Sequence, residues 1–263
     1  FYAIVSSETV AKAVLRRSSG RVDGLVVEHH SAGGHNAPPR RSGEEHLAGE
    51  PFSPRDEPDL ARIAALGVPF WLGGGYGSPA RLQEAIALGA VGVQVGTPFA
   101  HCRESGFAPA IKRVFLERAL AGELTVETDL RASPTAYPFK VVRELSADLK
   151  TRQRRCDLGY LRQPYVRPDG TVGYRCPAEP LAAYTAKGGL AAEAEGRQCL
   201  CNGLLAAIGL GQALAGDVAL PGVAPSGVAP DGTEPPIVTS GTALAWVAPL
   251  VAHFSERGRL SRR

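Results

Sequence analysis

Three glycine-rich turns carry the residues of this sequence that could do chemistry. The turns are Ser31-Ala32-Gly33-Gly34-His35 after the apolar run GLVVE, residues 73–78 (GGGYGS) after VPFWL, and Gly96-Thr97-Pro98 after VGVQV. Glycine lets the backbone approach a ligand closely and adopt positive φ angles. Backbone N–H groups at the start of a following helix favour an anion. The spacing therefore predicts a phosphate-binding site built from these turns.

His35 is the candidate catalytic residue, because it comes directly after Gly33 and Gly34 and so lies at the mouth of the expected phosphate site. Imidazole is suited to proton transfer near pH 7. The alternative is an exposed loop histidine without a role, and the neighbouring glycine turns favour the functional interpretation. The other histidines considered lack this context and are expected to be structural or surface residues: His29, His30, His46 and His101. No carboxylate or cysteine stands at metal-ligand spacing from the His29-His30 pair, so no metal site is predicted.

Gln94 alternates with Val93 and Val95 and is expected to point the opposite way, toward the inside of the fold. A buried amide needs hydrogen-bond partners. A bound ligand could supply them, and a core glutamine satisfied by the backbone is the alternative.

The elements that would position these residues alternate between strand and helix. Apolar runs at 1–5, 24–27, 68–72 and 91–95 predict strands, and amphipathic patterns at 8–17, 59–66 and 79–88 predict helices, with Ser7 and Ser78 as N-caps and Gly67 and Gly89 as stop signals. This alternation predicts βαβ units and a parallel sheet. Four units do not close an eight-stranded barrel. They form an open sheet or part of a barrel, and the start at Phe1 inside an apolar run leads us to expect four preceding units.

The rest of the chain does not continue this alternation of strands and helices. Residues 36–58 are rich in proline and charge, and predict a surface loop that is either a lid or an insertion without a role. We expect helices at 110–120, 202–214 and 243–253, a loop-rich stretch over 129–180, a surface loop over 216–236, and a basic tail at 255–263. The predicted organisation is a barrel part over 1–130 and an extension over 131–263 that packs on it.

The extension holds four of the five cysteines: Cys156, Cys176, Cys199 and Cys201. Their spacing, C-x₁₉-C-x₂₂-C-x-C, lacks a CxxC knuckle, which favours buried thiols over a zinc site or an iron–sulfur cluster. Cys102 follows the third glycine turn and is expected to be a packing residue.

Composition narrows the class of protein. The 263 residues are 44% hydrophobic and carry a formal net charge of +3, which permits a buried core and does not indicate nucleic acid as a partner. The basic run at 150–155 has no interleaved aromatic residues and is expected to be a solvated loop. No apolar run approaches 18 residues, so no membrane partner is predicted, and we expect a cytoplasmic protein.

Taken together, the turns resemble the nitronate monooxygenase (2-nitropropane dioxygenase) family. The family pattern AGGH, then AGG, then VQ[VM]GT[PR]F is similar to residues 32–35, to Leu72-Gly73-Gly74, and to residues 93–99 (VQVGTPF). The link at 88–92 (LGAVG) is similar to the family's LGADG. The resemblance covers residues 1–130.

The resemblance implies a fold, a cofactor and an activity. The fold would be α/β, an FMN-binding TIM (β/α)₈ barrel of which about four βα units are present, with a loop-rich C-terminal extension. His35 would be the catalytic base, and FMN would be held by Ala32, Gly33, Gly34, Gly73, Gly74, Gln94, Gly96 and Thr97. The enzyme would oxidise alkyl nitronates or nitroalkanes with O₂ to a carbonyl compound and nitrite. Whether the protein forms a homo-oligomer is left open by the sequence.

Two alternatives remain at this point. Flavin-dependent enoyl-acyl-carrier-protein reductases, which use NAD(P)H, carry the same motifs. The chain could also be a half-barrel that binds phosphate ligands without catalysis. The long 36–58 segment, which replaces the family's short one, leaves the substrate open.

Overall fold

The computed structural model describes residues 1–40, 51–146, 154, 156–211 and 236–241. The chain forms two compact units. Unit 1 comprises Phe1–Glu104 and the segment that begins at Ser240, and unit 2 comprises Ser105–Thr239. Several expectations lie outside the described residues: His46, the basic run apart from Arg154, the loop at 216–235, the helix at 243–253 and the basic tail.

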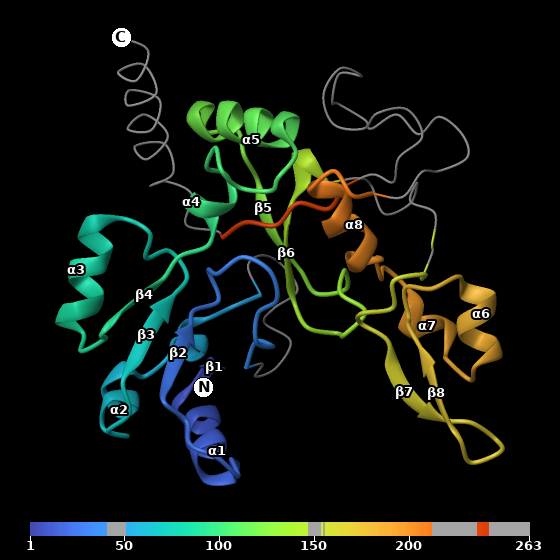
Figure 1. Ribbon diagram of the computed structural model, residues 1–263, viewed down its shortest axis with the longest axis horizontal. Coiled ribbons are helices and arrows are strands. Elements are labelled where there is room, and N and C mark those ends of the chain that lie inside the picture. The colour runs from blue at the N-terminus through green and yellow to red at the C-terminus, as the bar shows by residue number, and fades with distance from the viewer. Residues whose placement is uncertain (41–50, 147–153, 155, 212–235, 242–263) are drawn as a thin grey trace. The chain divides into compact units, whose positions relative to one another are not determined.

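Unit 1 is built on a parallel sheet of four strands in the order β1-β2-β3-β4 (Figure 1). Consecutive strands pair in parallel, as successive units do in a (β/α)₈ barrel. The predicted α/β class is therefore confirmed. The strands are β1 (Tyr2–Val5), β2 (Gly24–Glu28), β3 (Phe70–Gly73) and β4 (Gly92–Gln94), and the helices are α1 (Glu8–Arg17), α2 (Leu60–Ala64), α3 (Pro79–Ala87) and α4 (Thr97–Ala100), with a 3₁₀ turn at Pro54–Asp56.

Side-chain caps fix where the helices of unit 1 begin. Ser7 accepts a hydrogen bond from Val10 N, and Ser78 accepts one from Arg81 N, as the sequence predicts. Asp59 caps α2 in the same way. Each cap satisfies a backbone N–H group that the helix itself leaves unpaired.

One face of the sheet packs against the helices and the other does not. Val5, Leu25, Val27, Phe70 and Leu72 form a core with Ala11 of α1, Ile63 of α2 and Ala85 of α3. Because side chains alternate along a strand, the intervening residues point to the opposite face. There Tyr2 and Ile4 are exposed, and Tyr2 meets Trp71 edge to face. In a (β/α)₈ barrel this second face lines the interior.

In its described residues, unit 2 contains one long helix, two antiparallel hairpins and three short helices. The helix α5 spans Pro109–Ala121 and ends at Gly122 in the left-handed conformation, which confirms the helix expected at 110–120. The other elements are β5 (Val126–Asp129), β6 (Phe139–Val142), a 3₁₀ turn (Arg143–Leu145), β7 (Gln163–Val166), β8 (Val172–Arg175), α6 (Leu181–Ala186), α7 (Ala191–Ala194) and α8 (Leu200–Ala207).

Unit 2 differs from the sequence expectations in two details. The stretch 129–180 is loop-rich, as expected, but it also contains most of both hairpins, whose four-residue strands are too short to show a clear alternation in the sequence. The helix expected at 202–214 begins at Leu200 and ends at Ala207, since Gly209 takes a positive φ. Among the described residues, no helix is both long and apolar enough to cross a membrane.

Candidate functional site

The first and second glycine turns lie in direct contact at the carboxyl edge of the sheet. A Cβ atom added to Gly74 would lie 2.9 Å from Ser31 Oγ and 3.0 Å from Ala32 N. Gly74 also has a φ of +97°, which side-chain-bearing residues rarely adopt. Glycine is therefore required here both for the backbone conformation and for the close approach of the two turns.

The third turn reaches the first through Ser240 and Gly241. The backbone N–H of Gly241 donates to Thr97 Oγ1 at 3.2 Å, and Thr97 Oγ1 shares a 3.2 Å hydrogen bond with Ser240 Oγ. A Cβ on Gly33 would lie 2.9 Å from the carbonyl carbon of Ser240. All three turns thus meet around one place, as the predicted phosphate site requires.

Ser240 and Gly241 are residues that the sequence analysis missed. Ser240 is buried, and the segment lies between Gly33 and Thr97. A signal exists in the sequence, because Ser240-Gly241 follows the apolar pair Ile237-Val238 just as the other glycine turns follow apolar strands. The contact between Ser240-Gly241 and Thr97 was not predicted because more than 140 residues separate them in the sequence.

Two glycines of the turns border space that no atom of the described residues fills. A Cβ on Gly34 or on Gly96 would find nothing within 4 Å among the described residues. Gly96 is the N-cap of α4, so Thr97 and Pro98 open a short helix after the third turn. The turns therefore divide into glycines that hold the protein together, Gly33 and Gly74, and glycines that leave room beside the backbone.

Gln94 stands in one row with Gly73 and Glu28 across the sheet. The strand register pairs Glu28 with Gly73 and Gly73 with Gln94. Their neighbours Val27, Leu72 and Val93 pack toward the helices, so Glu28 and Gln94 belong to the opposite face, as predicted for Gln94. The expected burial of Gln94 is wrong: its side chain is exposed, because within the described residues nothing covers this face beside it.

Glu28 is a second residue that the sequence analysis passed over. It is half-buried at the end of β2, and burial raises the pKa of its carboxyl group. A single carboxylate that closes the apolar run GLVVE, directly ahead of the first turn, was the signal available in the sequence. It places an ionisable group on the same sheet face as Gln94.

His35 ends the first turn and is half-buried. Desolvation lowers its pKa from the ordinary value of 6.5, so the imidazole is neutral at pH 7. The turn is closed behind it by Asn36, whose buried side-chain amide donates to the carbonyl of Ala32 at 3.1 Å. A neutral imidazole held at such a turn is equipped to accept a proton.

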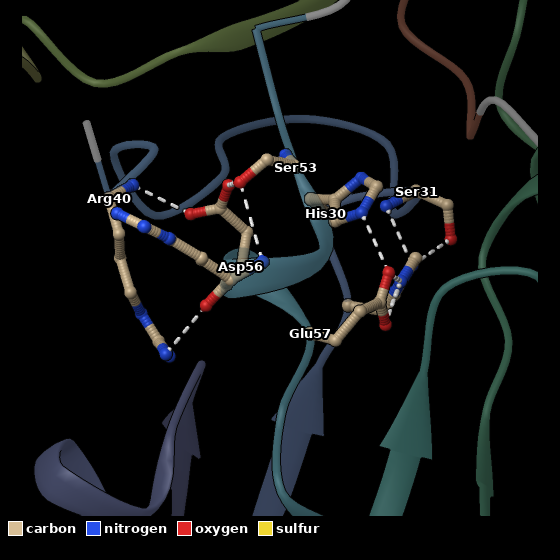
Figure 2. Close-up of polar contacts among 8 residues, drawn as sticks. His30, Ser31, Arg40, Ser53, Asp56 and Glu57 are labelled. Carbon is tan, nitrogen blue, oxygen red and sulfur yellow. Dashed lines mark hydrogen bonds and ion pairs between the residues drawn. The ribbon is translucent and has the colours of Figure 1, made fainter. Parts of the chain in front are cut away.

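Glu57 joins the two histidines that precede the first turn (Figure 2). Its carboxylate contacts His29 Nε2 at 2.8 Å and His30 Nε2 at 3.2 Å, and the His30 ring stacks on Phe52. Burial opposes ionisation, but the hydrogen bonds from His29 and His30 hold the pKa of Glu57 below its usual range. The sequence interpretation that these histidines lack a carboxylate is wrong, because the chain returns to them after more than 25 residues.

The returning segment is itself ordered by local hydrogen bonds. Ser53 and Asp56 form a capping box around the 3₁₀ turn, and Asp56 also accepts from the backbone N–H of Arg40 at 2.6 Å (Figure 2). The ligand atoms of His29, His30 and Glu57 lie within 4.8 Å of one another, a spacing that a metal ion could bridge. The described part of the 36–58 segment therefore packs against the first turn.

Comparison with known proteins identifies the family. The sequence pattern of the nitronate monooxygenase family matches residues 1–149, which is more than half of the chain and includes all three glycine turns of the strands. The chain belongs to the nitronate monooxygenase family. The family match ends at residue 149, whereas the first segment of unit 1 ends at Glu104. The predicted domain boundary at residue 130 coincides with neither and stays a prediction.

The relatives of this nitronate monooxygenase family member include a dehydrogenase of Mycobacterium tuberculosis. That protein, (3aS,4S,5R,7aS)-5-hydroxy-7a-methyl-1-oxo-octahydro-1H-indene-4-carboxyl-CoA dehydrogenase, is 28% identical over 153 residues, which cover 57% of this chain and 38% of the relative. Among solved structures, a nitroalkane oxidase from Streptomyces ansochromogenes is 22% identical with a TM-score of 0.41, over 54% of this chain and 38% of that one. FabK from Thermotoga maritima is 22% identical with a TM-score of 0.37, over 54% and 39%. The chain spans about two fifths of the length of these proteins.

Members of the nitronate monooxygenase family depend on a flavin, and the residues present here fit its phosphate group. Gly34 and Gly96 border space that the described part of the chain leaves open, and Thr97 places a hydroxyl in the third turn. Gly33 and Gly74, whose Cβ atoms would clash, keep the turns close enough to act together. The backbone amides of these turns could thus surround one anion.

Proposed function

We propose that this chain supplies the phosphate-binding and proton-transfer part of an FMN-dependent enzyme that oxidises alkyl nitronates or nitroalkanes with O₂ to a carbonyl compound and nitrite. The observation that carries the proposal is the convergence of three glycine turns with a half-buried, neutral His35 at the end of the first. Family membership and a relative that is itself a dehydrogenase support an oxidoreductase.

In this proposal the turns bind and His35 moves the proton. The phosphate would be held by backbone amides and the Thr97 hydroxyl, the full set being Ala32, Gly33, Gly34, Gly73, Gly74, Gln94, Gly96 and Thr97. When bound, FMN supplies the two-electron oxidation and the reaction with O₂. His35 would take the proton from the carbon that bears the nitro group, and its resulting positive charge would stabilise the nitronate.

Two assays on the purified intact protein test the activity. We expect a yellow protein that releases FMN on denaturation and produces nitrite from nitroalkanes under O₂. A colourless protein that does not bind added FMN would overturn the proposal in favour of a phosphate-binding module without catalysis.

A second candidate is a flavin enzyme that acts on an acyl thioester, such as an NAD(P)H-dependent enoyl-acyl-carrier-protein reductase. The observation that favours it is the 28% identical relative, whose substrate is named as a CoA thioester. NADH oxidation that depends on an enoyl thioester, without nitrite release from nitroalkanes, would support this candidate and exclude the first.

The pH dependence of turnover follows from the environment of His35. Desolvation lowers the pKa of His35 below 6.5, and the base must be neutral to accept a proton. We therefore expect kcat/KM for neutral nitroalkanes to fall as the pH drops through a midpoint below 6.5. The same shift removes folding stability as the pH falls below 6.5, because the unfolded chain binds that proton first. An acidic limb centred above 7 would contradict the assignment, and the kcat/KM profile from pH 5 to 8 measures it.

A further inference from the structure

Four of the five cysteines gather in unit 2, although their spacing in the sequence is irregular. Cys176 and Cys199 are buried together with Ala178, and Cys156 and Cys201 pack against them. These four residues, called the cysteine cluster below, come from three separate segments. Cys156 lies ahead of β7, Cys176 follows β8 directly, and Cys199 and Cys201 stand at the start of α8. The fold thus packs together four cysteines that are far apart in the sequence, apart from the pair Cys199 and Cys201.

One arginine lies beside the cysteine cluster. The guanidinium of Arg162 donates to the carbonyl of Cys156 at 2.8 Å. Cys199 is the N-cap of α8 and Cys201 lies in its first turn.

The cysteine cluster is a weak hydrophobic core by itself. Apart from the four cysteines it contains only Ala178, and no large apolar side chain of the described residues belongs to it. The apolar area that such small side chains bury gives little stabilisation. The five cysteines of this chain carry thiols, so no disulfide reinforces the cysteine cluster.

Buried oxygen atoms of residues close in sequence to the cysteines give a second observation. Glu179 Oε1, Gln198 Oε1 and Asn202 Oδ1 are buried without a hydrogen-bond partner among the described residues. Gln198 and Asn202 directly flank the Cys199–Cys201 pair in the sequence, and Glu179 comes three residues after Cys176. Unpaired buried polar atoms commonly mark the surroundings of an ion or an ordered water.

We propose that Cys156, Cys176, Cys199 and Cys201 bind one metal centre through four thiolates, either a single Zn²⁺ ion or an iron–sulfur cluster. Sets of four thiolates suit both centres. The centre would join the end of β8 to the start of α8 and to the segment at Cys156, where the cysteine cluster itself buries little apolar area. The proposal does not depend on the flavin chemistry of unit 1.

Elemental analysis of the intact protein, purified without oxygen, tests the proposal and separates the two centres. A zinc site gives about one zinc per chain. A four-iron cluster gives about four iron atoms with an equal amount of acid-labile sulfide, and an EPR signal in one oxidation state. Less than a tenth of either amount, together with rapid reaction of all five thiols with a thiol reagent in the native protein, overturns the proposal.

A pair of serine variants ties the metal to these residues. Cys176→Ser and Cys201→Ser are each expected to lower the metal content at least fivefold, whereas Cys102→Ser, outside the cluster, leaves it unchanged. Unchanged metal in both cluster variants overturns the assignment. If the variants do not fold, the wild-type protein decides: removing its metal with a chelator should raise the number of thiols that react with a thiol reagent from one to five. Five reactive thiols before the metal is removed contradict the proposal.

Discussion

Replacing His35 by alanine is expected to lower turnover of neutral nitroalkanes by about 10²–10⁴-fold while FMN stays bound. The imidazole is half-buried and its pKa is lowered, so it is a neutral proton acceptor at pH 7. The phosphate contacts that we propose come from backbone amides, which the substitution leaves in place. The measurements are kcat with a nitroalkane and the flavin content of the purified variant.

The choice of substrate makes the His35 experiment specific. A preformed nitronate has already lost the proton that His35 would remove, so His35→Ala should slow its oxidation far less than that of the neutral nitroalkane. His30→Ala is the matched control, because it removes an imidazole that is also half-buried close to the first turn. Equal losses on both substrates would show that His35 positions the substrate or the fold rather than moving a proton.

The sheet of unit 1 could be predicted because its determinants are local. Apolar runs such as GLVVE, followed by a glycine turn and a capped helix, specify each βα unit independently of the others. The edge at which the turns gather follows from the parallel direction of the strands. Even the face of Gln94 follows from simple alternation beside Val93, although its exposure does not.

What the sequence did not predict depends on contacts between distant segments. Glu57 reaches His29 only because the capping box of Ser53 and Asp56 shapes the returning chain. Ser240 meets Thr97 across more than 140 residues. The entropic cost of bringing two distant segments together rises only slowly with the number of residues between them, so chains of many lengths and compositions can connect them. Such contacts therefore leave no periodic pattern in the sequence.

The cysteine cluster could not be predicted from the sequence for the same reason. Metal sites are recognised in sequences by ligand pairs at fixed short spacing, and only Cys199 and Cys201 are close in this chain. The hairpin formed by β7 and β8 carries Cys176 to the others, and its short strands were themselves not predicted. Because these strands were not predicted, the cysteine cluster could not be predicted either.

Replacing Gly96 by alanine is expected to lower the affinity for FMN by about 10–100-fold with little loss of stability. A Cβ at Gly96 would meet no described protein atom within 4 Å, and its φ of −110° is open to alanine. The cost to folding should stay below about 1 kcal/mol, the order of a weakened N-cap. A methyl group can therefore harm binding here only by occupying space that the ligand needs.

Two further glycine variants define what the Gly96 result means. Gly20→Ala, where the added Cβ also meets nothing within 4 Å, should change neither FMN affinity nor the melting temperature. Gly74→Ala should reduce both, since its φ of +97° and the 2.9 Å approach to Ser31 Oγ strain the fold. Fluorescence titration with FMN and thermal unfolding of the apoprotein measure the two quantities. If Gly96→Ala binds FMN as tightly as Gly20→Ala does, the phosphate does not lie at the third turn, and the convergence of the turns serves packing alone.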